Sequence, residues 1–560
     1  MNFKKDIVKL LKDIVKIDES IIEIPPRPEM GDYSLPCFSL AKEFKKSPAE
    51  IAQELARKLP LKQPISRIEI KGPYLNFFIS KDRIAESVLN DIAKEKERFG
   101  SSKGKSGKEG SKDKRKRETV MIEFPSPNTN KSLHLGHVRN IVIGDRGIHI
   151  CKSMLAYQKF GKDSKGKPRD PCKEKIKTDH FVGDFYVKFN DAAKENPDLE
   201  EEAKDMLLKW EKKDKEVRKL WKIMNTWAYE GFEETYEKLG VSFNKYYYES
   251  DFYDKGKDII IKALKKGIFR KDESGAVIAG LDRYKTPDKV LLRADGTSIY
   301  ITQDIFLARK KFTDYKLDRS IYVVASEQNT HFMQLFSILD MLGYRWAKKC
   351  FHLSYGMVYL PNGRMKSREG TVVDADDLIE EMKRIAEAEI MKRDKKLTKA
   401  ELKKRAEIVG LGALKFYFAK MDAAKDMVYN PEESISFEGE TGPYVQYTYA
   451  RICSILKKYG KKPDTKIDFK LLKESKENEL IKMLGQFPDE VAAAAEHLRP
   501  HLIATYLIRL CQAFNSIYHE FPILQADEET KKARILMISC VKQVIANSLD
   551  LLGIEYVERM

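Results

Sequence analysis

Apolar and polar positions along the chain form three regions with different periodicities. In the first region, apolar residues recur at helical spacing at Ile7, Leu10, Leu11, Ile14 and Val15. A second helix is expected at about 48–58, and the runs RIEI (67–70) and YLNFFI (74–79) alternate as short strands do. Residues 1–95 therefore predict a small α/β domain.

In the middle region, residues 119–373, short apolar runs typical of strands alternate with helical patterns. The expected strands are TVMIEF, VLLR, SIYIT and IYVVAS, and helices are expected from about Leu135 and His331. This alternation predicts a Rossmann-like parallel sheet with crossover helices. Two charged stretches, 162–177 and 197–222, interrupt the alternation, which indicates that an insertion splits the sheet.

The last region, residues 374–560, has a helical pattern almost throughout. One apolar stripe recurs at helical spacing through Leu507, Leu510, Cys511, Phe514, Tyr518 and Phe521. We therefore expect an all-helical C-terminal domain.

Composition narrows the class of protein. A chain of 560 residues suggests roughly three to five domains, and 103 Lys and Arg against 86 Asp and Glu give a net charge of +17. Such an excess favours a polyanionic partner, for example a nucleic acid. Without an apolar run of about 20 residues or a signal-like N-terminus, a soluble, cytoplasmic protein with no membrane partner is expected. The seven cysteines are widely spaced with no CxxC pair, so we expect reduced thiols and no structural metal.

Residues 96–118 separate the first two regions. Within this segment, 101–117 contain eight Lys or Arg, two acids and no apolar residue. Nothing there can offset the entropy of ordering, so a flexible basic linker is predicted. A charge run of this kind is usually a solvated tether, and the alternative is an arm that grips RNA.

The segment EFPSPNTNKSLHLGHVRN (123–140) runs from the end of an apolar strand through a turn into a helix. A helix that starts there presents unpaired N–H groups and the positive end of its dipole, which is where nucleotide phosphates bind in doubly wound sheets. His134 and His137 share one face of the first turn and can donate hydrogen bonds to phosphate oxygens. Gly136 has no side chain, so an adenine ring can lie against the backbone. The alternative is two surface histidines at a helix start.

This segment resembles the signature of class I aminoacyl-tRNA synthetases, and SPNTNKSLHLGHVRN is similar to that of the arginyl family. The resemblance extends over nearly the whole chain through GDYSLPCFSLA, GPYLNFFI, YYESDFY, ADGTSIYITQDI, ETGPYVQYTYARI and LLGIEYVERM. These motifs occur in the family's order. Members of the arginyl family usually require tRNA before they activate the amino acid.

The second class I signature, Lys-Met-Ser-Lys-Ser, corresponds here to RMKSREGTVV after GMVYLPNG. If Met365 is aligned with the signature, its second Lys falls on Ser367, with Arg364 and Lys366 beside it. The family resemblance also implies that Lys131 helps to hold the phosphates. The chemistry needs a cation that neutralises charge on the leaving group, and either Lys or Arg can supply it.

A pocket for a guanidinium needs carboxylates and other acceptors in a fork, beside an aromatic face. The resemblance places five residues in the arginine site: Asn128, Glu249, Tyr300, Asp304 and Gln328. Tyr300 and Asp304 are four residues apart and are neighbours if the chain is helical there. On pattern alone, Glu249 and Asp304 would be ordinary surface acids.

Aromatic residues among basic ones suggest where RNA binds, because unpaired bases stack on Tyr, Phe or Arg planes. The resemblance places Tyr444, Tyr447, Tyr518 and Met560 in the anticodon site, although Tyr518 also lies on the apolar stripe. It further places Tyr74 and Asn76 at the D-loop of tRNA, where both could equally be core residues.

The resemblance implies the activity of an arginine–tRNA ligase that uses ATP with Mg²⁺, L-arginine and tRNA(Arg), and a monomer is expected. In such enzymes the arginine carboxylate attacks the α-phosphorus of ATP, and the terminal adenosine hydroxyl of tRNA, typically the 2′-OH, then accepts the arginyl group. The expected domains are 1–95 at the tRNA elbow, the linker 96–118, the catalytic domain 119–373 and the anticodon-binding domain 374–560. The alternatives are another class I synthetase and a non-catalytic tRNA-binding relative.

Overall fold

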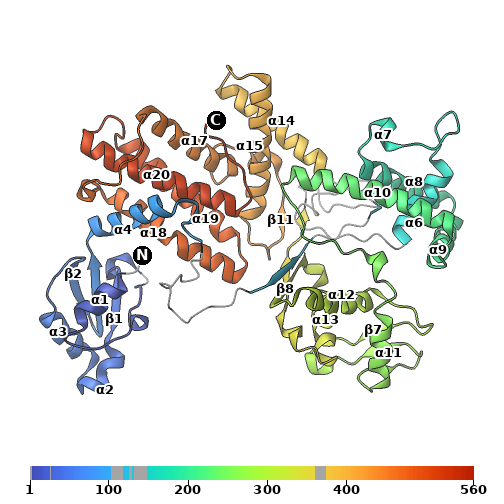
Figure 1. The fold of residues 1–560 in the computed structure, drawn as a ribbon, viewed down its shortest axis with the longest axis horizontal. Helices are drawn as coiled ribbons and strands as arrows, with labels where there is room; N and C mark the ends of the chain where they lie inside the picture. The colour runs from blue at the N-terminus through green and yellow to red at the C-terminus, as the bar shows by residue number, and fades with distance from the viewer. Residues whose placement is uncertain (1–2, 26, 102–117, 125–128, 131–147, 360–373) are drawn as a thin grey trace. The chain divides into compact units, whose positions relative to one another are not determined.

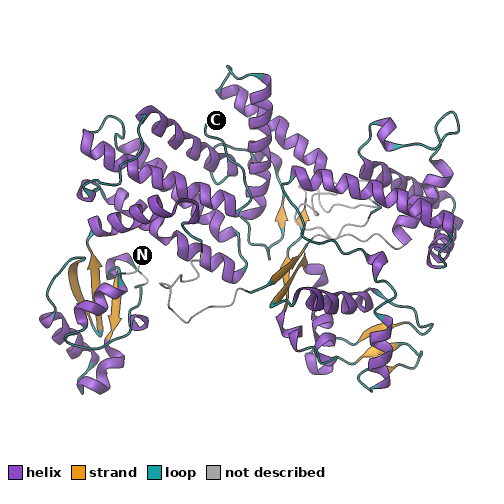
Figure 2. Ribbon diagram, viewed as in Figure 1, coloured by secondary structure: helices purple, strands orange, loops and turns teal. Residues whose placement is uncertain are grey.

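The computed structural model describes residues 3–25, 27–101, 118–124, 129–130, 148–359 and 374–560. Contacts divide the chain into two compact units. The first unit combines Met1–Lys103 with Ser436–Met560, and the second comprises Gly104–Ile435. Figure 2 shows short strands among a majority of helices. In the described part of the chain, no helix is both long and apolar enough to cross a membrane.

An antiparallel sheet forms the N-terminal part of the first unit, and helices pack on it (Figure 1). Its strands occur in the order β1 (Tyr33–Pro36), β3 (Tyr74–Ile79), β2 (Ile65–Lys71), with helices α1 (Lys4–Leu11), α3 (Pro48–Lys58) and α4 (Lys81–Glu95). Helix α3 begins where expected because Ser47 and Glu50 form a reciprocal capping box and Pro48 occupies the first turn. The small α/β domain expected from the sequence is present.

The C-terminal part of the first unit is a bundle of long helices. They are α17 (Gly442–Tyr459), α18 (Ser475–His497), α19 (His501–Glu520) and α20 (Glu528–Leu551). On the predicted stripe, Leu507, Leu510, Cys511 and Phe514 are buried, whereas Tyr518 is 39% exposed. Helix α4 packs on α18 and α20, and Asn547 of α20 donates hydrogen bonds to the Phe99 and Lys96 carbonyls at 2.9 Å. The two ends of the chain therefore fold together.

The second unit is built around a parallel sheet, as the sequence predicted. Its strand order is β4 (Val120–Glu123), β8 (Arg319–Ala325), β9 (Cys350–Tyr355). Helices α12 (Tyr300–Tyr315) and α13 (Asn329–Met341) precede and follow β8 along the chain (Figure 1). A second parallel pair joins β10 (Val358–Tyr359) to β11 (Met427–Val428).

Two of the expected strands differ in the structure. The run VLLR lies in β7 (Lys289–Leu292), which belongs to a separate antiparallel sheet with β5 (Arg270–Lys271) and β6 (Val277–Ala279). The run SIYIT instead leads into α12, which begins at Tyr300. Its alternation is short, and the buried Ile301, Ile305, Ala308 and Phe312 continue at helical spacing. The helical spacing extends over more residues than the alternation, and the segment folds as a helix.

An insertion of helices separates β4 from β8, in agreement with the sequence. Its helices are α6 (Ile148–Phe160), α7 (Pro171–Glu174), α8 (Thr178–Glu195), α9 (Asp198–Glu211) and α10 (Lys215–Lys238). They enclose a core that includes Phe181, Phe185 and Trp210. As predicted, the insertion interrupts the sequence between two strands of the parallel sheet, although β4 and β8 pair directly.

The second unit extends to Ile435, and the last segment of the first unit begins at Ser436. Helices α14 (Ala375–Arg393) and α15 (Lys399–Ala419) belong to the second unit. Asp376 of α14 contacts two residues of α10. The Thr235 hydroxyl donates a hydrogen bond to the Asp376 carboxylate at 2.9 Å, and the Lys238 ammonium forms an ion pair with it at 2.7 Å. A helical pattern continues across this boundary, so periodicity alone does not reveal it.

A buried ion pair joins the first strand of the parallel sheet to α12. Lys311 is almost fully buried, and its ammonium contacts the carboxylate of Glu123 at the end of β4. The same ammonium lies 4.8 Å from the centre of the Tyr322 ring on β8. Removing one member of a buried pair leaves an uncompensated charge, so this pair fixes α12 against the end of β4.

We expect Lys311→Met to lower the free energy of unfolding of the second unit by about 3 to 5 kcal/mol, because Glu123 loses its partner. Urea unfolding followed by hydrogen exchange in β8 measures the loss. Lys310→Met is the matched control, since Lys310 is on the same helix but pairs with Asp314 at the surface. Its cost should stay below about 1 kcal/mol. Equal losses for both variants would contradict a structural role for the buried pair.

Candidate active site

The carboxyl end of β8 places the candidate site at one edge of the parallel sheet. Strand β8 ends at Ala325 and leads through a short 3₁₀ helix, Ser326–Gln328, into α13. In open parallel sheets, ligands bind outside the carboxyl ends of the strands. Gln328 is exposed at this position.

Two helices bring Asp304 and His331 together at this edge. Tyr300 and Asp304 lie on the first two turns of α12, which confirms that they are helical neighbours. The His331 Nε2 atom, in the first turn of α13, lies 2.8 Å from the Asp304 Oδ2 atom. Tyr300 is 69% exposed and the Asp304 side chain 37%, so both remain accessible to a ligand. His331 therefore orients a carboxylate whose other oxygen can accept from a ligand.

A second histidine, His352, packs against Phe332, which follows His331 in the chain. The His352 ring lies 4.4 Å from the Phe332 ring, and its Nε2 donates to the Val324 carbonyl at 3.0 Å. Burial lowers the pKa of His352, and the nearby His331 lowers it further. A neutral His352 thus closes the end of β8 without adding a charge beside Asp304.

The other expected site residues are placed as follows. Glu249 opens a 3₁₀ helix, Glu249–Asp251, after the insertion. Thr129 and Asn130 of the signature turn are buried. Outside the described residues lie Asn128, Lys131, His134, Gly136, His137, Arg364, Met365, Lys366 and Ser367.

Sequence reasoning missed two residues that shape the site, His331 and Lys311. His331 follows Gln328 by three residues and lies in the first turn of a helix that starts at the end of a strand. That position was a usable signal, because such helix starts border ligand sites. No local sequence pattern marks Lys311 as a buried residue, because its partner Glu123 is 188 positions away in the sequence.

The expected tyrosines of the C-terminal bundle surround one arginine. The Arg451 guanidinium lies 4.9 Å from the Tyr447 ring centre and 5.1 Å from that of Tyr518. Arg451 also donates to Asn515 at 2.6 Å, and Asn515 donates to the Tyr444 hydroxyl at 2.9 Å. We call Tyr444, Tyr447, Arg451, Asn515 and Tyr518 the aromatic cluster. It offers planar faces and a cation, which suits stacked bases and phosphates.

The remaining expected RNA contacts lie in the same unit. Tyr74 is half-exposed and packs edge-on against Phe38 at 5.7 Å. Asn76 is only 4% exposed and accepts a hydrogen bond from Ser34 at 2.7 Å. Its side chain therefore serves the core of the sheet in this structure. Met560 is partly exposed at the end of the chain.

In the described part of the chain, Asp179, His180 and Asp376 form a group whose spacing could suit a metal ion. The Lys177 ammonium lies 2.8 Å from the Asp179 carboxylate and 2.9 Å from that of Asp376. A cation already occupies the position that a metal would take. The group is therefore an ion-pair cluster that links α8 and α10 to α14.

The cluster holds His180 in its charged form. Burial alone would lower the pKa of His180, but hydrogen bonds to Asp374 at 3.3 Å and Asp376 at 3.4 Å outweigh it and raise the pKa to about 10. The pKa of Asp376 is lowered by His180, Lys238 and Lys177 despite burial. Three cations thus face three carboxylates: Lys177, Lys238 and His180 with Asp179, Asp374 and Asp376.

Comparisons with known proteins agree with this architecture. Family models match the arginyl tRNA synthetase N-terminal domain at 1–79, the catalytic domain of class I (R) tRNA synthetases at 102–157 and 167–430, and the DALR anticodon binding domain at 445–560. The fold and these domains are those of a class I tRNA synthetase.

Individual relatives specify the family. The chain is 44% identical to an arginine–tRNA ligase of Treponema denticola, over 96% of this chain and 94% of the relative. It is 42% identical to that of Bacteroides thetaiotaomicron, over 95% and 94%. The solved arginyl-tRNA synthetase of Thermus thermophilus matches with a TM-score of 0.74 and 25% identity, over 100% of this chain and 99% of that one. The chain belongs to the arginyl-tRNA synthetase family.

The ion-pair cluster predicts a pH dependence of stability. Because the pKa of His180 is raised from its ordinary 6.5 to about 10, its stabilisation is complete below about pH 6.5 and is lost as pH rises to about 10. We expect the difference in unfolding free energy between the parent chain and His180→Gln to shrink over this interval. Urea unfolding at a series of pH values measures it. A difference that stays constant from pH 6.5 to 10 would contradict the charged state of His180.

Proposed function

We propose that this chain is an arginine–tRNA ligase, which activates L-arginine with ATP and transfers it to the 3′-terminal adenosine of tRNA(Arg). The observation that carries the proposal is the 44% identity to an arginine–tRNA ligase over 96% of the chain. The parallel sheet, with an acid and a histidine at its carboxyl edge, is consistent with it.

Arginine binds at the edge of the sheet. Asp304, held by His331, and Glu249 supply carboxylates for the guanidinium, whose five donors need paired acceptors. The exposed Tyr300 ring provides a flat face beside it, and Gln328 a further polar group. Asn128 binds the polar end of the amino acid.

ATP binds as its Mg²⁺ complex, which is a substrate. His134 and His137 contact its phosphates and Gly136 leaves room for the adenine ring. Lys131 and the segment of Arg364, Met365, Lys366 and Ser367 neutralise the leaving pyrophosphate.

The reaction needs no side-chain nucleophile. An arginine carboxylate oxygen forms a bond to the α-phosphorus of ATP while the bond to pyrophosphate breaks. The 2′-hydroxyl of the terminal adenosine then attacks the carbonyl carbon of arginyl-adenylate, loses its proton and displaces AMP. Catalysis comes from positioning and from charge neutralisation.

The first unit binds tRNA. Residues 1–95 contact the D-loop or elbow, with Tyr74 at the surface, and the C-terminal helices bind the anticodon through the aromatic cluster and Met560. The basic segment 96–118 links them to the catalytic domain. The protein acts as a monomer in the cytoplasm.

Pyrophosphate exchange with each amino acid, with and without tRNA, tests the function. Exchange should occur with arginine alone among the amino acids and should be nearly silent without tRNA, as is usual in this family. Ligation of radioactive arginine to tRNA should follow. Exchange with a different amino acid, or none under any condition, would refute the proposal.

Asp304→Asn is expected to weaken the apparent arginine affinity by orders of magnitude, because bound arginine covers this carboxylate and losing one partner of a charge pair buried in a complex costs about 2 to 5 kcal/mol. Glu249→Gln should act in the same direction. His331→Asn, which removes only the orienting contact, should raise KM for arginine less. None should change KM for ATP appreciably.

Asp314→Asn is the matched control for the arginine site. Asp314 lies on the same helix and pairs with Lys310 at the surface. Its KM for arginine should match that of the parent. Normal arginine binding by both Asp304→Asn and Glu249→Gln would show that the pocket lies elsewhere.

In the aromatic cluster, Tyr447→Ala should weaken tRNA binding by about 1 to 3 kcal/mol, the range for a base stacked on an aromatic ring. The melting temperature of Tyr447→Ala should equal that of the parent chain. Tyr459→Ala, on the same helix but outside the cluster, is the control. A fall in melting temperature with unchanged tRNA binding would assign Tyr447 to the core, where truncation of a buried ring costs about 3 to 5 kcal/mol of stability.

A further inference from the structure

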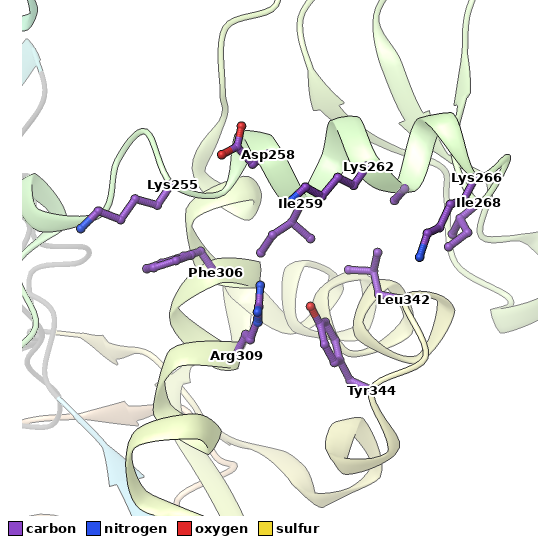
Figure 3. Close-up of a pocket in the computed structure, with 11 residues that line it drawn as sticks. Lys255, Asp258, Ile259, Lys262, Lys266, Ile268, Phe306, Arg309, Leu342 and Tyr344 are labelled. Carbon is purple, nitrogen blue, oxygen red and sulfur yellow. The ribbon is translucent and has the colours of Figure 1, made fainter.

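The second unit contains a pocket between α11 (Lys257–Lys265) and α12 (Figure 3). Leu342 and Tyr344, which follow α13, close one side, and the cavity volume is about 430 Å³. That volume falls at the lower end of the range for small-molecule sites, roughly 300 to 1,000 Å³. Among the described residues, those expected at the arginine site do not line it.

Cations dominate the lining of this pocket. Among the described residues, Lys255, Lys262, Lys266 and Arg309 line it with one acid, Asp258. Figure 3 shows Lys266, Arg309 and the Tyr344 hydroxyl directed into the space between the helices, whereas Asp258 and Lys255 point away from it. Lys266 and Arg309 belong to different elements, so the positive charge converges from two sides.

These cations have no ion-pair partner among the described residues, in contrast to Lys311 or Lys177. Lys262, Lys266 and Arg309 are exposed to solvent, and like charges gathered at one place raise the local positive potential and attract anions. Lys and Arg side chains only donate hydrogen bonds, so the complementary ligand must offer several acceptor oxygens. A phosphate chain meets both requirements.

The charge of the pocket selects the kind of phosphate. Lys255 and Asp258 point away from the space in Figure 3, so Lys262, Lys266 and Arg309 supply three positive charges. A phosphodiester supplies only one negative charge per nucleotide. A di- or triphosphate chain concentrates the required charge in one small ligand.

Apolar side chains lie among the cations on the same elements (Figure 3). Ile259, Ala263, Ile268 and Leu342 contribute aliphatic surface, and Phe306 contributes a ring. Such side chains can cover the face of a planar base or ribose. Among the described residues the lining includes no amide side chain, and if its Lys and Arg side chains hold the phosphates, no group remains to read the edge of a base, so the identity of the base should matter little.

We propose that this pocket binds a nucleoside di- or triphosphate at a site separate from the catalytic ATP site. Lys262, Lys266 and Arg309 hold the phosphate chain, the Tyr344 hydroxyl donates to it, and the base lies against Phe306 and its aliphatic neighbours. Binding does not depend on which base is present.

Equilibrium dialysis of the full chain with the β,γ-methylene analogue of ATP tests the site. The parent chain should bind one more equivalent of analogue than Lys262→Glu/Lys266→Glu, in which affinity at this site should fall at least tenfold. GTP should displace the extra equivalent with an affinity within about threefold of the analogue. Since the readout is a difference in bound equivalents, it is independent of whether the chain ligates arginine.

Lys257→Glu/Lys265→Glu is the matched control, with the same charge change on the same helix at residues that do not line the pocket. It should retain the extra equivalent, and both double variants should keep the parent's ligation rate. Equal stoichiometry in the parent and Lys262→Glu/Lys266→Glu would overturn the proposal, as would equal losses in both double variants.

Two further probes separate nucleotides from related ligands. Inorganic tripolyphosphate should bind at least tenfold more weakly than the analogue, because it cannot use the apolar side chains. Equal binding would overturn the assignment of a nucleotide. A loss of tRNA affinity in Lys262→Glu/Lys266→Glu, with no change in bound nucleotide, would make the pocket an RNA contact instead.

Discussion

The buried contact between Glu123 and Lys311 fixes the geometry on which the second unit depends. Glu123 ends β4, from which the chain enters the signature segment, and Lys311 lies one turn before the end of α12. A lysine with so little exposure needs its carboxylate, because an unpaired charge in the interior is costly. The pair therefore sets where α12 lies against the sheet. Asp304, seven residues earlier on α12, takes its position from the same constraint and meets His331 from α13.

Charge pairing distinguishes structure from binding in this unit. Where cations serve the fold, each has a carboxylate partner, as Lys311 has Glu123 and Lys177 has Asp179 and Asp376. The cations of the pocket between α11 and α12 have no such partner among the described residues. In a chain of net charge +17, unpaired positive charge in a cavity is the feature that calls for an anionic ligand.

The sequence predicted those parts of the fold that rest on local patterns. Helix α3 has a capping box and a proline at its start, and the alternation of β8 with helices indicates a parallel sheet. SIYIT was misjudged because five alternating residues fit a strand, although the apolar spacing that follows continues a helix. The expected boundary near 374 lies between helices, and periodicity does not show whether α14 and α15 pack with the parallel sheet or with the C-terminal helices.

From the sequence, only those residues of the candidate site that belong to family motifs could be predicted. Tyr300 and Asp304 follow from a motif and a helical spacing, and the structure places both on α12. His331 and Lys311 depend on contacts between distant segments, which no periodicity encodes. Asn76 shows the opposite case, since a strand position does not reveal which face is buried, and its side chain bonds to Ser34.

The central claim is that arginine is held at the carboxyl edge of the sheet by the carboxylate that His331 orients. A crystal structure of the chain with a non-hydrolysable arginyl-adenylate analogue tests it most directly. We predict that the guanidinium lies within hydrogen-bond distance of the Asp304 carboxylate, beside Tyr300, with the contact between Asp304 and His331 retained. An analogue whose guanidinium lies elsewhere, with Asp304 facing solvent, would contradict the claim.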